Sequence, residues 1–387
     1  MKITTKKTVA WSMALTLSLN LAACGSAGTA SDASSSAESG KTDSSVSASI
    51  ADASASTSSV TDSADSAAES TSEAEEVSAP VTYPVTVTDA LGREVTVAQK
   101  PEKLVSGYYI TTSLLISLGL SDKLVGVEAK ADTRSIYALS APGILELPSV
   151  GTAKEFDLEG CAALSPDLVI VPAKLKDSIP AMEELGLTVV AVNPEDQDLL
   201  FDTIDLIGTA TDTVSQGETL KQYITDSLTE LDTALVDADT PSVYLAGNSS
   251  LLQTAGLQMY QNSMIENAYG SNAAYDISDT YWAEVSYEQL LSWNPDCIVL
   301  ASDAEYTTDS VLQDASLADC TAVKENQIYQ IPGDIEALDS PIPGSFLGSI
   351  YLASVLHPDL VTADDFADAT KEFYETFYGF TPEEYEK

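Results

Sequence analysis

The side chains of this sequence that can hold an anion gather in one stretch of the chain. Arg134 is one of only two arginines in 387 residues, and Lys130, Lys154 and Lys174 lie near it in the sequence. Arginine binds carboxylate and phosphate groups through two parallel hydrogen bonds. The group therefore predicts a site for a ligand that carries carboxylates or phosphate, or for an anionic iron chelate. The alternative is a solvated surface arginine with scattered lysines.

The residue patterns of most enzymes are missing from the sequence. It has no GxSxG, P-loop or GxGxxG motif, and its single histidine, His357, lies in the apolar pattern of a late helix before a proline. No Ser-His or Cys-His pair is available, and His-rich zinc or manganese sites are disfavoured. We expect no enzyme, no metal site and no cofactor. A metal-dependent or carboxylate-based activity is the remaining enzymatic alternative.

One motif occurs twice, 129 residues apart. The stretches "DLEGCAALSPDLVIV" and "SYEQLLSWNPDCIVL" each have a glutamate, Glu159 or Glu288, seven residues before a Pro-Asp pair that opens an apolar run. Asp157 and Ser286 are of the types that cap helix N-termini. The motif therefore predicts the same helix and following strand in two related lobes. A glutamate in the first turn also favours the helix dipole, by about 0.3–1 kcal/mol.

The N-terminal part of the chain has the features of an export signal and a tether. Three lysines precede an apolar stretch too short to span a bilayer, and "LAAC" ends at Cys24. This resembles the lipobox of bacterial lipoproteins, in which the cysteine is diacylated; an ordinary signal peptide ending near a cysteine is the alternative. Two acyl chains suffice for stable anchoring. Residues 25–80, nearly all small, hydroxyl or acidic, predict a disordered tether that reaches about 40 Å.

Strand and helix patterns alternate through the rest of the chain and restart after Pro241. Runs such as "DLVIVPA" alternate with helical stretches such as "PAMEELG", which is typical of βαβ units with a parallel sheet. We expect an N-terminal α/β lobe at 81–212, an interdomain helix at 213–238 and a C-terminal α/β lobe at 239–387. In that helix, apolar residues recur at helical spacing on one face: Leu220, Ile224, Leu228, Leu231 and Leu235.

Two lobes of this kind should share one ligand cleft, because ligands gather at the carboxyl ends of parallel strands. Tyr108 and Tyr109 directly follow the first expected strand of the N-terminal lobe, so they are candidates for ligand contacts. The net charge of −43 argues against nucleic acid and anionic lipid as partners.

The assembled pattern resembles the ABC-transporter substrate-binding proteins that take up ferric siderophores, haem and cobalamin. The resemblance rests on "VTDALGREVTV", both Glu…Pro-Asp motifs, "AVKENQIYQIP" and "SPIPGSFLGSIYLASVLHP", behind a lipobox. It implies two Rossmann-like lobes with parallel sheets, joined by one long rigid helix. It also implies that Glu159 and Glu288 meet arginines of the membrane permease.

The same resemblance adds candidate ligand contacts. Trp282 and Asp334 match contacts of cobalamin-binding relatives, and Tyr137 lies where haem-binding relatives have an iron-ligating tyrosine. A surface turn is the alternative for Asp334. With Tyr108, Tyr109, Arg134 and Lys174, these residues make up the expected ligand site.

The resemblance therefore predicts the extracytoplasmic binding component of an ABC importer for an iron complex. A ferric siderophore is the first expected ligand, with haem or cobalamin next, so the ligand itself carries iron or cobalt. We expect a monomer held to the outer face of the cell membrane by lipid on Cys24, or a periplasmic lipoprotein in a two-membrane cell. ATP hydrolysis belongs to a separate subunit. The alternative is a lipid-anchored surface module that binds a protein partner or acts as a sensor.

Overall fold

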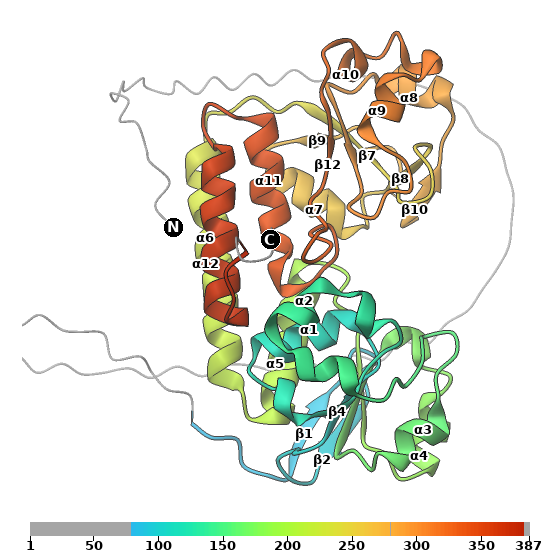
Figure 1. Cartoon of the computed structure of the whole chain (residues 1–387), viewed down its shortest axis with the longest axis vertical. Coiled ribbons are helices and arrows are strands. Elements are labelled where there is room, and N and C mark those ends of the chain that lie inside the picture. The colour runs from blue at the N-terminus through green and yellow to red at the C-terminus, as the bar shows by residue number, and fades with distance from the viewer. Residues whose placement is uncertain (1–78, 279, 383–387) are drawn as a thin grey trace, which may run out of the picture. The chain divides into compact units, whose positions relative to one another are not determined.

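The computed structural model describes residues 79–278 and 280–382, which belong to one compact unit (Figure 1). Cys24 and residues 25–78 of the expected tether lie outside the described residues. Within the described part of the chain, no helix is both long and apolar enough to cross a membrane.

A short hairpin precedes the first lobe, as the alternation in "PVTVTDALGREVTV" predicts. Its strands, β1 (Val85–Thr88) and β2 (Glu94–Val97), pair antiparallel. The buried carboxylate of Asp89 binds Arg93 and accepts a hydrogen bond from the backbone N–H of Ala191, while Arg93 donates to the carbonyl of Val189. These bonds tie the hairpin to the edge of the first sheet, so the two charged residues have a structural role.

The first lobe is a parallel sheet with helices packed on it. Its four strands lie in the order β4-β3-β5-β6, and every pairing is parallel. Their bounds are β3 Leu104–Ser106, β4 Leu124–Gly126, β5 Leu168–Pro172 and β6 Val189–Val192. The helices are α1 Tyr109–Ser117, α2 Ser135–Ser140, α3 Leu158–Ala163, α4 Ile179–Glu184 and α5 Gln197–Thr211. Short 3-10 turns lie between them, at Ser121–Lys123, Ala131–Thr133, Pro142–Glu146 and Ala173–Leu175.

The second lobe has a mixed sheet. Strands β9, β7, β11 and β12 are parallel to one another, whereas β8 runs antiparallel to β7 and β10 antiparallel to β8. The strands are β7 Ser242–Ala246, β8 Gln253–Ala255, β9 Ser271–Asn272, β10 Trp282–Glu284, β11 Cys297–Leu300 and β12 Ile328–Gln330. A wholly parallel sheet was therefore the wrong expectation for this lobe. The link from β7 to β8 is too short for a parallel crossover, so the chain returns as a hairpin.

Helices of the second lobe cover its sheet and continue toward the first lobe. They are α7 Tyr260–Asn267, α8 Tyr287–Trp293, α9 Thr308–Leu312, α10 Thr321–Lys324, α11 Phe346–Leu356 and α12 Ala363–Tyr378. Two 3-10 turns complete the lobe, at Ala315–Leu317 and Pro343–Ser345. The single histidine, His357, caps α11; it is buried, and its Nε2 lies 3.1 Å from the carbonyl oxygen of Ala268.

Both lobes use the same strand order. Numbered within each lobe, the parallel strands follow 2-1-3-4, as β4-β3-β5-β6 and as β9-β7-β11-β12. The repeated motif forms the helix before the third strand, α3 in the first lobe and α8 in the second. The aspartates of the Pro-Asp pairs are also equivalent: Asp167 accepts from the backbone N–H of Lys103, and Asp296 from that of Ser242. The fold confirms two related α/β lobes.

One long helix, α6 (Val214–Leu235), connects the lobes, and Figure 1 shows it alongside α11 and α12. Its predicted apolar face is buried, apart from Leu228, which is partly exposed. Tyr223 of α6 packs its ring against Phe346 of α11 and Phe373 of α12. The same continuous core includes residues of β3 and of β7, so the lobes share apolar packing as well as a helix.

The three cysteines of the described residues, Cys161, Cys297 and Cys320, are free and buried. Burial raises the pKa of Cys161 to about 11 and that of Cys297 to about 12. Both thiols therefore stay protonated and serve as small apolar groups in their cores.

Candidate functional site

The carboxyl ends of strands from both lobes meet around one small cavity. Tyr109 begins the helix after β3, and Arg134 and Tyr137 come after β4. From the second lobe, Asp303 follows β11 and Glu336 follows β12. The cavity encloses about 210 Å³. Its position agrees with the rule that ligands bind at the carboxyl ends of strands in open α/β sheets.

Arg134 is the only described residue with a cationic side chain that lines this cavity. Its guanidinium carbon lies 4.0 Å from the centre of the Tyr109 ring, a cation–π geometry. Its Nε is buried with no hydrogen-bond partner among the described residues, and Glu128 Oε1 is 3.7 Å away. Glu128 therefore offsets the charge of Arg134, and the arginine retains an unused donor.

A buried polar network holds Glu128 in position. Thr112 donates to its Oε2 at 2.6 Å, and the hydroxyl of Tyr137 donates to its Oε1 at 2.7 Å. Burial and the negative charge of Glu128 raise the pKa of Tyr137 well above its ordinary value. Tyr137 is fully buried. Its hydroxyl is thus protonated and bound to Glu128 within the first lobe. In this structure it is not a free phenolate of the kind that the predicted iron ligand requires.

Hydrogen bonds join the two lobes beside the cavity. Ser113 of α1 donates to Glu336 at 2.6 Å and lies 2.8 Å from the hydroxyl of Tyr378 in α12. Tyr109 of α1 donates to the hydroxyl of Ser340 at 3.1 Å. Burial raises the pKa of Glu336 to about 7, because the carboxylate has little solvent around it. The lobes are therefore closed on one another at this point.

The remaining predicted ligand residues do not line the cavity. Tyr108 caps α1, and its ring lies 5.3 Å from that of Tyr109 in an edge-on contact. Lys174 is exposed and lies 3.9 Å from a carboxylate oxygen of Glu195, and Asp334 is also exposed. Trp282 is half-buried in β10, against the core. Neither Lys130 nor Lys154 lines the cavity. Of the expected group of cationic residues, only Arg134 therefore does so.

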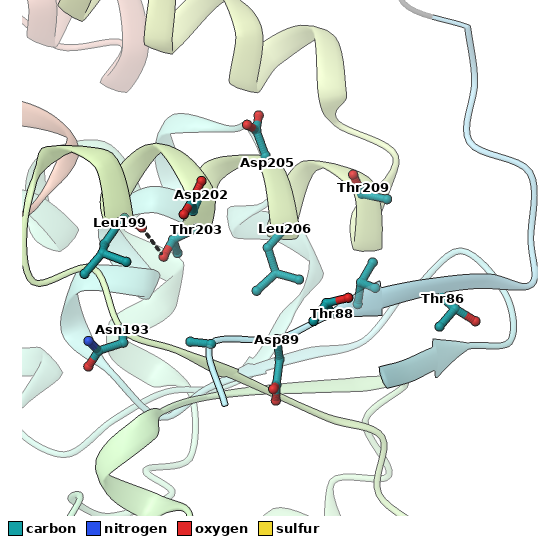
Figure 2. A pocket seen from close by; sticks show the side chains of 12 residues that line it. Thr86, Thr88, Asp89, Asn193, Leu199, Asp202, Thr203, Asp205, Leu206 and Thr209 are labelled. Carbon is teal, nitrogen blue, oxygen red and sulfur yellow. Dashed lines mark hydrogen bonds between the residues drawn. The ribbon is translucent and has the colours of Figure 1, made fainter. Parts of the chain in front are cut away.

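A larger pocket lies within the first lobe, between β1 and α5, and encloses about 490 Å³ (Figure 2). Two of its carboxylates already have partners, because Asp89 binds Arg93 and Asp205 binds Lys221. No residue of the second lobe lines it. It therefore offers a ligand neither an unpaired cation nor a contact with both lobes.

The two glutamates of the repeated motif lie on the surface. Glu159 is in the first turn of α3 and Glu288 in the first turn of α8, and both side chains are exposed. The predicted caps are present: Asp157 accepts from the backbone N–H of Gly160, and Ser286 from that of Gln289. The pKa of Glu288 lies below its ordinary value because its own backbone N–H and the Ser286 hydroxyl bind the carboxylate. Both glutamates are therefore available to a cationic partner.

The fold and this site agree with comparisons to known proteins. The periplasmic binding protein family model matches residues 104–335, more than half of the chain. The chain belongs to this family. It is the substrate-binding component of an ABC importer, and it is not an enzyme. Proteins of this family act outside the cytoplasm, where they bind small-molecule ligands and deliver them to a permease.

Three relatives illustrate the range of this family. The ABC transporter substrate-binding lipoprotein YvrC of Bacillus subtilis is 25% identical over 71% of this chain and 86% of its own length. The molybdate-binding protein MolA of Haemophilus influenzae is 25% identical over 76% of this chain and 90% of its own. The crystal structure of a periplasmic solute binding protein from Veillonella parvula aligns with a TM-score of 0.67 and 26% identity, over 77% of this chain and 93% of that one.

The sequence predictions for this binding protein missed Glu336, which lines the cavity, and also Ser113 and Glu128, which lie beside Glu336 and Arg134. Ser113 is separated from Glu336 by more than 200 residues of sequence, and only the folded chain brings the two together. One signal was available for Glu336. It lies in "GDIEALDSP", directly after an expected strand. Residues at the carboxyl ends of strands are the ones expected at a ligand cleft.

Proposed function

We propose that this binding protein captures an iron complex in the cavity between its lobes, a ferric siderophore first, and is anchored through a lipid on Cys24. The charge of the cavity wall supports the choice. Arg134 is offset by Glu128, and Asp303 and Glu336 are acidic, so a complex without net negative charge meets no repulsion. A ferric trihydroxamate is such a complex. Haem and cobalamin are the next candidates.

The size of the cavity favours a second candidate, a small oxyanion such as molybdate. The enclosed volume of about 210 Å³ is below the roughly 300–1,000 Å³ of pockets that hold larger ligands. A ferric siderophore fits only if the lobes open wider than they are here. MolA, a relative of similar length, is a molybdate-binding protein. The acidic side chains of the cavity oppose this candidate, so charge and volume point to different ligands.

Delivery of the ligand would use Glu159 and Glu288. Both are exposed and occupy equivalent positions in the two lobes, so a permease with two cationic patches could bind them together. The alternative, a surface module that binds a protein partner or acts as a sensor, requires neither the cavity nor this pairing. Continued binding of a protein partner by a chain that binds no small molecule would favour that alternative.

Native mass spectrometry of the full chain tests the proposed cargo. The chain is mixed with a ferric trihydroxamate, a ferric triscatecholate, haemin, cobalamin and molybdate together, and retained adducts are identified by mass. We expect one adduct, with the ferric trihydroxamate. A molybdate adduct alone would overturn the siderophore proposal and favour the oxyanion. In Arg134→Ala the expected adduct should weaken, because the cavity loses the Nε–H donor that has no partner among the described residues and is available to a ligand oxygen.

The lipid anchor is tested by Cys24→Ala. We expect the altered protein to leave the membrane fraction and appear in the soluble fraction, because the diacylated cysteine would supply both acyl chains. Continued retention on membranes would refute the anchor.

A further inference from the structure

The carboxyl group of Glu336 has no cationic partner of its own. It is 9% exposed and accepts from Ser113 at 2.6 Å and from the hydroxyl of Tyr374 at 3.4 Å. Among the described residues, no lysine, arginine or histidine lies within salt-bridge distance of it. Hydroxyl donors stabilise a buried carboxylate less than a paired cation does. The negative charge of the Glu336 carboxylate therefore contributes to the electrostatic potential in the cavity that it lines.

The one nearby cation has its charge offset by another residue. The interaction of Arg134 with Glu336 is a Coulombic attraction without a hydrogen bond, whereas Glu128 lies 3.7 Å from the Nε of Arg134. Glu128 is buried, and hydrogen bonds from Thr112 and Tyr137 hold its carboxylate in place. It is therefore a fixed part of the first lobe. The guanidinium is thus compensated before any ligand arrives.

The other groups that face Glu336 add no positive charge. α1 contributes the hydroxyl of Ser113, and α12 contributes the hydroxyls of Tyr374 and Tyr378. On the second lobe, Asp303 lines the same cavity. Asp339 lies three residues after Glu336, and its carboxylate accepts hydrogen bonds from Ser302. With Arg134 and Glu128 cancelling, the acids Asp303 and Glu336 remain, and the cavity wall is negative.

We infer that Glu336, together with Glu128, determines ligand selection by charge, so that the cavity accepts neutral or positively charged metal complexes and rejects negatively charged ones. This inference rests on the proposed function and narrows its ligand class. Because burial raises the pKa of Glu336 to about 7, the rejection of anions also weakens as the pH falls below that value.

A series of three ferric complexes that share one iron centre and differ in the charged group at one end tests the inference. A linear trihydroxamate that ends in a primary amine carries one positive charge, its N-acetyl derivative is neutral, and its N-succinyl derivative carries one negative charge. The iron centre is the same in all three. Their Kd values for the full chain are measured at pH 8 in wild type, Glu336→Gln and Glu128→Gln. Glu305→Gln is the matched control, an exposed glutamate outside the cavity that changes the net charge equally.

In wild type we expect affinity to fall from the cationic to the anionic complex. Glu336→Gln and Glu128→Gln should each reduce the cation-to-anion affinity ratio by about tenfold, the effect of roughly 1.4 kcal/mol between nearby charges. Glu305→Gln should leave the ratio unchanged. A merely structural role of Glu336 would weaken all three complexes alike and keep their ratio, and that result would overturn the inference.

A second measurement uses the unaltered chain, in case a variant does not fold. Between pH 8 and pH 6 the same affinity ratio should fall, since Glu336 becomes protonated in this range. A ratio that does not change with pH would contradict the inference. Equal binding of the three complexes at pH 8 would overturn the inference but leave the siderophore proposal standing, whereas no binding of any of them would overturn both.

Discussion

At the scale of single residues, the partner of a buried carboxylate decides how that carboxylate affects the stability of the protein. Asp89 is paired with Arg93 and ties the hairpin to the first sheet, and its pKa lies below the ordinary value. Burial opposes this shift, and the hydrogen bonds from Arg93 and from the backbone of Ala191 and Leu91 together outweigh it. Glu336 has hydroxyl donors only, and burial raises its pKa. Both shifts make stability depend on pH, but with opposite sign: ionised Asp89 stabilises the fold at neutral pH, whereas ionised Glu336 destabilises it.

Glu336→Gln should change how stability depends on pH. The carboxyl has a pKa of 4.5 ordinarily and about 7 in the fold, so the folded protein binds the proton more tightly. Its contribution to the free energy of unfolding is present below pH 4.5 and is lost as the pH rises toward and beyond 7, by about 3 kcal/mol in all. Glutamine stays neutral throughout. Relative to wild type, the variant should thus gain about 3 kcal/mol between pH 4.5 and pH 8, measured by urea unfolding.

The exposed Glu305→Gln is the control for this comparison. Its difference from wild type should be the same at both pH values, because the side chain has solvent around it. A constant difference for Glu336→Gln as well would contradict the buried, unpaired state of this carboxyl.

At the scale of elements, periodic patterns predicted the structure well. The residues with i, i+4, i+3 spacing lie in α6, and the predicted cap residues stand at the N-termini of α3 and α8. The strands β8 and β10 were harder, because each has three residues and no alternation long enough to detect. The two-lobe repeat was predictable since its motif includes a cap, a core position and a Pro-Asp turn.

Shortening a core residue of α6 should destabilise the whole described unit. Leu231 is fully buried in the core that both lobes share, so Leu231→Ala should lower the free energy of unfolding by about 2–5 kcal/mol. Thr229→Ala, an exposed position two residues earlier, should change it by less than about 0.5 kcal/mol. Thermal or urea unfolding measures both. Equal effects of the two substitutions would mean that α6 does not pack as described.

At the scale of the whole molecule, the site could be predicted only in outline. The carboxyl-end rule selected the cleft, and Tyr109, Arg134 and Tyr137 do line its cavity. Lys174 and Asp334 do not, because the conformation of the segments after the strands decides which side chains reach the cavity. Trp282 does not, because it packs against the core from β10. The charge balance also escaped prediction. Glu336 reaches the cavity that Arg134 lines through tertiary packing, which no spacing along the chain indicates.

The proposed delivery to the permease would use a glutamate of each lobe. Glu159→Ala together with Glu288→Ala should abolish uptake in cells and leave the Kd of the ligand unchanged, because neither side chain lines the cavity. Uptake of radiolabelled ligand and equilibrium binding measure the two effects. The paired control is Glu155→Ala with Glu284→Ala, exposed glutamates outside α3 and α8 that remove the same charge. A parallel loss of ligand affinity would refute the docking role.

The central claim is that ligand binds between the lobes, and amide hydrogen exchange tests it most directly. Exchange of the full chain is followed with and without the retained metal complex. The account predicts slower exchange in both lobes at once, around residues 109–113 and 133–137 of the first and 302–304 and 333–337 of the second. Protection confined to β1 and α5, which line the larger pocket of Figure 2, would contradict it.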